Sequence, residues 1–487
     1  MNSEKRIIDE ESNVSIKEKA EINIQTDLTD YEKEIERSYL RKIDYRILPV
    51  VIMVYIASLI DRGVVNYALV NGLRDGLNLS NIQEGNATTF FYVFYILFET
   101  PSNVILKKLR PRIWFPLIGL GFSISTLLSA FAKTGTEYVI YRSLLGAFEA
   151  GFTPGVVGYL GYWYVRGDIG KRMVIFFTAV PLSGIFGKPF SAGLASMKIL
   201  LKYPYQNIYL FHGILTILIT GGSYFFLIDY PDKSNFLKPE EKELLLKRLQ
   251  AEQGMASKIK PDFKDTIRFL LDWKLWAFSF LFFGLNNSIV ILNLFAPTVI
   301  STMGFSGVTS TYLATITSAT GLFGTLSSVY FLNKVPYYKL IIIYATITAI
   351  GFSVALFSNG TGLRLAFIAI SGFGASPVVP MSISWMSINQ GGVYKALISS
   401  AVQLSVGSIC GVVSPRFFTK KYLPRFRNGV ILYLCALGAS ICIAISLSIY
   451  FRRENKRRDE NPEDVSHLSL EDQRKLCDKH PNFRYRL

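Results

Sequence analysis

Hydrophobic residues gather in twelve strings between about residues 46 and 451, with short polar stretches between them. Each string holds roughly twenty residues, the length at which an α-helix crosses a bilayer. A longer polar stretch, 230–273, follows the sixth string. The pattern predicts twelve transmembrane helices in two sets of six, at 46–66, 84–107, 113–132, 137–164, 173–197, 207–229, 274–299, 308–333, 338–358, 363–387, 393–417 and 428–451.

The sequence therefore predicts an all-α integral membrane protein. Thr29 and Glu32 have the spacing of a capping box, which indicates a helix ahead of the first span, and Pro239 begins another in the linker. We expect five parts: an N-terminal tail (1–45), a six-helix bundle (46–229), a linker with amphipathic helices (230–273), a second six-helix bundle (274–451) and a C-terminal tail (452–487).

Composition supports a membrane protein, because 50% of the residues are hydrophobic, 18% are charged and the mean hydropathy is +0.31. The net charge is +16, but the basic residues border the apolar strings, where lipid headgroups account for them better than nucleic acid does. Their excess in the tails and in the 2–3 and 4–5 loops predicts cytosolic termini, although the basic 11–12 loop breaks the pattern. We expect a monomer in the plasma membrane.

Enzyme and metal signals are missing from the sequence. The four cysteines, at 410, 435, 442 and 477, lack the spacing of a zinc site, and no phosphate-binding loop, His-Glu-x-x-His motif or serine nucleophile elbow is present. We therefore expect no enzymatic activity, no metal and no cofactor. Any transport must use a gradient and not ATP bound to this chain.

The first six spans contain ionisable residues, whereas the last six have almost none. A charge at the bilayer centre costs at least ~2.5 kcal/mol, so such residues are candidates for a substrate or proton path. The residues in or near the first six spans are Asp61, Arg62, Glu99, Arg142, Glu149, Lys188 and His212.

Several motifs resemble the fungal allantoate permease family of anion:cation symporters, within the major facilitator superfamily. The matching stretches are Arg41-Lys-Ile-Asp44, Asp61-Arg62, Phe94-Tyr-Ile-Leu-Phe-Glu99-Thr-Pro101, Arg142-Ser-Leu-Leu-Gly146-Ala-Phe-Glu149 and Asn482-Phe-Arg-Tyr485. The resemblance implies two six-helix halves and proton-coupled uptake of a small organic anion by alternating access. It does not identify the substrate, since the residues after Asp61-Arg62 and at His212-Gly213 depart from the family's pattern.

Depth along the helices separates the candidates. At 1.5 Å per residue, Asp61 and Arg142 fall at similar depth in the outer part of the membrane. Either Arg142 attracts a carboxylate substrate or the two form a structural pair. Glu149 shares one side of its helix with Arg142 and is the first candidate to carry the proton, with Asp61 the second. Glu99 is deeper and, with Arg62, is assigned to gating, with proton relay the alternative for Glu99.

The remaining candidates concern the substrate. Lys188 lies between Gly187 and Pro189, and it either contacts the anion, pairs with Glu149 or reaches the headgroups. In the second half, Asn286, Asn293 and Trp385 could bind substrate or serve packing. His212 is predicted to be structural.

The resulting hypothesis is a secondary transporter whose partners are an organic anion (a carboxylate, a vitamin such as nicotinate, or a ureide such as allantoate), protons and membrane lipids. Arg142 and Lys188 attract the anion, and Glu149 or Asp61 carries the proton. A uniporter or exporter for the same substrates and a transporter-like nutrient sensor remain the alternatives.

Overall fold

The computed structural model describes residues 29–197, 201–253, 263–301, 303–305, 307–332, 334–417, 427–461, 464–465, 467–468, 473 and 476–487. The first 28 residues of the predicted N-terminal tail and most of the basic 11–12 loop lie outside this range. The described residues form helices and contain no strand.

The first half of the chain starts at the predicted capping box, in which Thr29 accepts from the backbone N–H of Glu32 and Glu32 accepts from that of Thr29. This prediction is confirmed. The helices are α2 (Asp30–Ala68), the π-helical turn η1 (Leu69–Leu73), α3 (Arg74–Leu77), α4 (Asn81–Lys108), α5 (Pro111–Ser129), α6 (Gly135–Glu149), α7 (Phe152–Trp163), α8 (Arg166–Phe176), α9 (Ala179–Ser196) and α10 (Pro204–Phe226). Helix α2 runs without interruption past residue 45, where we placed the end of the tail.

The second half follows two shorter helices, α11 (Pro239–Gln253), which begins at Pro239 as predicted, and α12 (Phe263–Leu270). Its long helices are α13 (Trp273–Ser301), α14 (Gly307–Phe331), α15 (Tyr337–Phe357), α16 (Thr361–Ile388), α17 (Val393–Phe417) and α18 (Arg427–Glu460). A short 3₁₀ turn, η5 (Cys477–Lys479), lies near the C-terminus.

The fourth predicted span, 137–164, is two helices and not one. The break falls at Ala150 and Gly151, four and three residues before Pro154, whose ring has no N–H to donate to the preceding turn. A Cβ at Gly151 would overlap the Ser102 side chain of α4, so the break also allows a close approach of the two helices. Glu149 consequently lies at the last position of α6. The fifth span is interrupted in the same way between α8 and α9.

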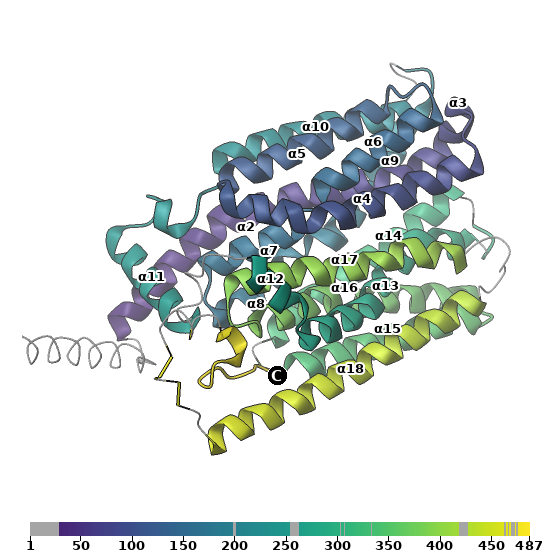
Figure 1. Ribbon diagram of the computed structural model, residues 1–487. Helices are drawn as coiled ribbons and strands as arrows, with labels where there is room; N and C mark the ends of the chain where they lie inside the picture. Colours follow the sequence, from purple (N-terminus) through teal and green to yellow (C-terminus); the bar gives the residue numbers. More distant parts are fainter. Residues whose placement is uncertain are drawn as a thin grey trace, which may run out of the picture.

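The two halves lie side by side, with α2 to α10 in one layer of Figure 1 and α13 to α18 in the other. Across the interface, α4 and α7 pack on α17, α8 packs on α14 and α16, and α9 packs on α14. We call the end of the bundle that carries α11, α12 and the C-terminal residues the tail side, and the end that carries α3 the far side. Ten of the described segments are long and apolar enough to span a membrane, and α8 and α9 together form one of them. The pair α6 and α7 forms the eleventh transmembrane segment, and α14 forms the twelfth.

Candidate functional site

A buried ion pair joins α2 to the end of α6. Arg62 Nη2 lies 2.9 Å and Nε 3.1 Å from Glu149 Oε1, and the Ser58 hydroxyl donates to the same oxygen. The side chain of Glu149 is 2% exposed and that of Arg62 is 26% exposed. Removing either charge would leave the other one unpaired in a largely buried site.

Three helices position this pair. Ser58 and Arg62 are four residues apart and therefore share one face of α2. The guanidinium of Arg62 lies over the rings of Phe91 and Tyr95 of α4, with 5.4 and 5.0 Å to the ring centroids. Glu149 reaches it from the bend between α6 and α7. The aromatic rings keep the cation in an environment with little competing water, which strengthens its attraction to the carboxylate.

Within the part of the chain that the structure describes, Arg142 contacts backbone oxygens and no carboxylate. Its Nη1 lies 3.5 Å from the backbone oxygen of Asp61, and its Nη2 lies 3.4 Å from that of Arg62. The guanidinium also lies over the Phe91 ring, 5.0 Å from its centroid. Arg142 therefore contacts the backbone of α2 at Asp61 and Arg62. The side chains of Asp61 and Arg142 do not form the structural pair that the sequence analysis left open.

Asp61 is separate from the ion pair although it is adjacent to Arg62 in the chain. Its carboxyl is fully buried, forms no hydrogen bond with a described residue, and lies near the hydroxyls of Thr126 in α5 and Thr216 in α10. Those hydroxyls donate to backbone oxygens one turn earlier. Successive residues of a helix point about 100° apart, so Arg62 faces Glu149 while Asp61 faces α5 and α10.

Glu99 links the two halves of the molecule. The Ser405 hydroxyl of α17 donates to Glu99 Oε2 of α4, and the Glu99 side chain is fully buried. Asn103, one turn further along α4, donates to the backbone oxygen of Glu99 at 2.7 Å. A polar link at this depth between helices of different halves must break or rearrange when the halves move apart.

Lys188 forms a second link between the halves, toward the far side. Its ammonium donates to the backbone oxygen of Ala314 in α14 at 3.2 Å, and the residue is 5% exposed. Among the described residues no carboxylate lies within ion-pair distance of it. Gly184 and Gly187 of α9 let the backbone pack closely on Ser318 of α14 and on α2, respectively. Lys188 is thus a buried cation with no counter-ion from the described part of the chain.

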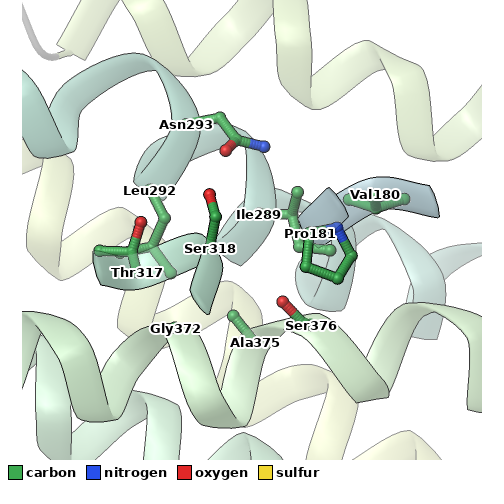
Figure 2. Close-up of a pocket in the computed structure, with 10 residues that line it drawn as sticks. All are labelled: Val180, Pro181, Ile289, Leu292, Asn293, Thr317, Ser318, Gly372, Ala375 and Ser376. Carbon is green, nitrogen blue, oxygen red and sulfur yellow. The ribbon is translucent and has the colours of Figure 1, made fainter. Parts of the chain in front are cut away.

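A partly open cavity lies between α9 and the second half, and its empty space of about 300 Å³ includes the opening to the surroundings. Hydroxyl and amide groups from α13, α14 and α16 enter it beside apolar side chains, as Figure 2 shows. None of the described residues that line it is charged. The lining residues are Val180, Pro181, Ile289, Leu292, Asn293, Thr317, Ser318, Gly372, Ala375 and Ser376. Asn293 is the predicted substrate-binding residue that reaches this cavity, and Lys188 neighbours it through the contact of Gly184 with Ser318.

Asn286 and Trp385 lie elsewhere in the second half. Asn286 donates to the backbone oxygen of Gly407 at 3.1 Å and to Cys410 Sγ at 3.5 Å, which ties α13 to α17. The indole of Trp385 is fully buried near the tail side and donates to the backbone oxygen of Arg486 at 2.9 Å. The structure therefore brings neither residue to the cavity.

His212 joins α10 to α9. Its Nε2 lies 3.0 Å from Ser191 Oγ, and its ring stands edge-on to Phe190 with the centroids 5.0 Å apart. The residue is fully buried and does not line the cavity. These contacts agree with the structural role that we predicted.

Two serines of the site were missed by the sequence analysis. Ser58 could have been found, because it stands one helical turn before Arg62 on the same face. Ser405 could not, because a serine in an apolar helix has no distinctive pattern and its partner Glu99 is 306 residues away.

Comparisons with known proteins agree with this architecture. A model of the Major Facilitator Superfamily matches residues 51–415. A high-affinity nicotinic acid transporter of Saccharomyces cerevisiae is 27% identical over 455 residues, covering 93% of this chain and 85% of that protein. A putative tartrate transporter of Agrobacterium vitis is 32% identical over 300 residues, 61% of this chain and 65% of that protein's length.

Solved structures share the fold. The proton:xylose symporter XylE superposes with a TM-score of 0.65 at 17% identity, covering 82% of this chain and 94% of that chain. The fucose:proton symporter FucP of E. coli gives a TM-score of 0.61 at 14% identity, with 82% and 98% covered. The predicted twelve-helix fold with two six-helix halves is therefore confirmed. Since the family model matches most of the chain, this protein belongs to the Major Facilitator Superfamily of membrane transporters.

Proposed function

We propose that this transporter carries a small organic anion together with protons by alternating access. The observation that carries the proposal is the coexistence of a buried Arg62–Glu149 pair with Lys188, a buried cation that has no counter-ion among the residues the structure describes. The transported molecules named for two relatives, nicotinic acid and tartrate, both carry carboxylates. A carboxylate is the natural ligand for an unpaired buried ammonium.

The anion would bind on the second-half side of α9. Its carboxylate would take the place of the Ala314 backbone oxygen as the partner of Lys188, and gain a charge-assisted hydrogen bond. The hydroxyls of Ser318 and Ser376 and the amide of Asn293 would hold the uncharged part of the molecule in the adjoining cavity. The absence of charged groups among the described lining residues favours a substrate with one or two acidic groups and a neutral body.

The proton would act through Glu149. When Glu149 takes up a proton it no longer neutralises Arg62, and the released guanidinium adds to the positive potential that attracts the anion. A high proton concentration therefore favours anion binding, and the sign of coupling is that of a symporter. Asp61 remains the second candidate carrier.

Uptake measured against pH tests this function. Cells that express the chain should take up labelled nicotinate faster as the external pH falls, and an uncoupler should abolish the gain. Unlabelled tartrate, allantoate and pantothenate compete to different degrees and so rank the substrate. Uptake that ignores both pH and the uncoupler would instead favour a uniporter or exporter. Signalling that persists after flux is abolished would favour a nutrient sensor.

The gating assignment of Glu99 predicts a specific effect of Ser405→Ala. The change leaves the buried Glu99 Oε2 without its donor, which costs about 1–3 kcal/mol in the conformation described and shifts the population toward the alternative one. We expect the maximal uptake rate to change at least about fivefold while the KM stays within about twofold. Ser446→Ala is the matched control, because Ser446 is exposed and bonds only within α18. Equal rates in both variants would argue against a gating role.

For location, we propose the plasma membrane, with the tail side in the cytosol and the chain acting as a monomer. The excess of basic residues in the tails and in most tail-side loops supports this orientation.

A further inference from the structure

The last residues of the chain fold back onto the tail side of the second half. We call residues 477–487 the C-terminal clasp; in Figure 1 the clasp is the yellow segment that ends beside the C label. Cys477 begins it with a φ of +50°, a backbone conformation that non-glycine residues keep only where the surroundings hold them. The clasp is therefore a docked element and not a free tail.

Asp478 anchors the clasp in a buried charged cluster, in which Asp272 Oδ2 also lies 2.6 Å from Lys395 Nζ and 3.7 Å from Lys274 Nζ. The Asp478 carboxylate, 1% exposed, contacts the ammonium of Lys274 at the start of α13 and lies 2.6 Å from that of Lys395 at the start of α17. The Tyr485 hydroxyl donates to it at 2.9 Å. Burial alone would raise the pKa of the Asp478 carboxyl, but Lys395 and Lys274 hold that pKa below its usual range. The anchor therefore stays charged at physiological pH and is weakened only in strong acid.

Backbone contacts extend the docking to the other helices. Arg458 of α18 donates to the backbone oxygens of Asp478 and Phe483 at 3.0 and 2.8 Å. In α16, Asn389 donates to the Arg486 oxygen at 3.0 Å and accepts from the Arg486 N–H at 2.8 Å. The Tyr337 N–H of α15 donates to the last backbone oxygen at 2.9 Å. The clasp thus ties together the tail-side ends of α13, α15, α16, α17 and α18.

The clasp also fixes the turn between α16 and α17. Gly391 in this turn has a φ of +70°, and a Cβ there would overlap the backbone N of Asp478. The turn lines a second, partly open cavity, whose opposite wall is α7 of the first half; its empty space of about 440 Å³ includes the opening to the surroundings. There Gly158 of α7 packs so closely on Leu397 of α17 that a Cβ would overlap it. The clasp therefore packs against the Gly391 turn, which leads into the part of α17 that contacts the first half on the tail side.

We propose that the C-terminal clasp can detach and that, when docked, it positions the tail-side gate, which we define as the Gly391 turn and the start of α17 where they meet α7. Docked through Asp478, it holds the Gly391 turn and the start of α17 against α7. Undocked, it leaves these segments free to move and the gate open to solvent. The inference rests on the contacts of this chain and requires neither a particular substrate nor proton coupling.

Cysteine labelling of the full chain in membrane vesicles tests the docking. With Cys410, Cys435 and Cys442 replaced by Ala, Cys477 is the sole cysteine, and its reaction with a membrane-impermeant maleimide on the tail side reports release of the clasp. Asp478→Asn should raise its labelling rate at least tenfold. Asp459→Asn, which removes the exposed contact of Asp459 with Arg484, should leave the rate within twofold. Equal rates in these two variants would overturn the anchoring by Asp478.

A second reporter tests the gate. Ser387→Cys, in the wall of the second cavity, is labelled in a chain whose Cys477 is replaced by Ser. Asp478→Asn should increase its labelling severalfold. Gly391→Ala should also increase the labelling of Cys477 and of Ser387→Cys, and it leaves every charge of the anchor in place. It is therefore the variant to use if Asp478→Asn does not fold. Release of Cys477 with no change at Ser387→Cys would overturn the positioning role. Because neither readout uses transport, failure here is distinct from failure of the proposed function.

Discussion

Glu149→Gln is expected to abolish the dependence of uptake on external pH and to bring uptake at neutral pH toward the rate that the unchanged protein reaches in acid, because the neutral Gln side chain mimics protonated Glu149. Gln occupies the same space and still accepts from Ser58, but it can neither take up a proton nor neutralise Arg62. The uncompensated Arg62 guanidinium lowers the stability of the folded protein by up to about 3 kcal/mol, and by less to the extent that water reaches this partly exposed side chain. Initial uptake rates of the labelled acid across a pH series measure the effect.

Glu84→Gln is the matched control, since Glu84 pairs with Arg74 at the exposed start of α4. It should change uptake little, because such surface pairs contribute at most about 1 kcal/mol. In the double variant Arg62→Gln with Glu149→Gln, the amount of folded protein should recover while the pH dependence stays absent. A pH dependence that survives in Glu149→Gln would make Asp61 the better carrier, and Asp61→Asn would then be the variant that abolishes it.

Lys188→Met is expected to raise the KM for the anion at least tenfold and to leave the thermal stability unchanged or higher. The ammonium contributes a charge-assisted hydrogen bond to bound carboxylate, about 1.5–3 kcal/mol, which corresponds to about 10- to 100-fold in affinity. In the protein without substrate the same ammonium is buried with no counter-ion among the described residues, so a methionine of similar length removes a desolvation cost. Uptake kinetics and the Tm of the purified protein measure the two effects.

The KM and the Tm of Lys188→Met together distinguish a substrate-binding role of Lys188 from a purely structural one. If Lys188 only ties α9 to α14 through Ala314, its loss should lower the Tm and leave the KM unchanged. Lys334→Met, in the exposed turn that follows α14, should change neither quantity.

The positions of the helices could be predicted closely, because the length of an apolar string reports directly on the bilayer that it crosses. The break between α6 and α7 was missed although its signal, Gly151 followed by Pro154, is in the sequence. Hydropathy averages over a window and does not detect a loss of backbone hydrogen bonds within it. This break matters, since it places Glu149 at the end of a helix.

The candidate site could be predicted in its members but not in its pairings. Depth arguments correctly bring Arg142 level with Asp61, whose backbone oxygen it contacts. They do not say which way a side chain points around the helix, and so Arg62, assigned only to gating, emerges as the partner of Glu149. Trp385 lies at the clasp and not at the cavity, because aromatic character alone does not distinguish a binding wall from a packed helix end.

The sequence by itself determined the membrane environment, the twelve helices and the unequal share of ionisable residues between the halves. These follow from local properties, namely hydropathy, helical period and the cost of a charge in hydrocarbon. The tertiary structure alone decided that Glu149 pairs with Arg62, that Asp61 faces α5 and α10, that Ser405 joins Glu99 across the halves and that Asp478 docks between Lys274 and Lys395. Each contact joins residues far apart in the chain through the rotation of packed helices, which no local pattern encodes.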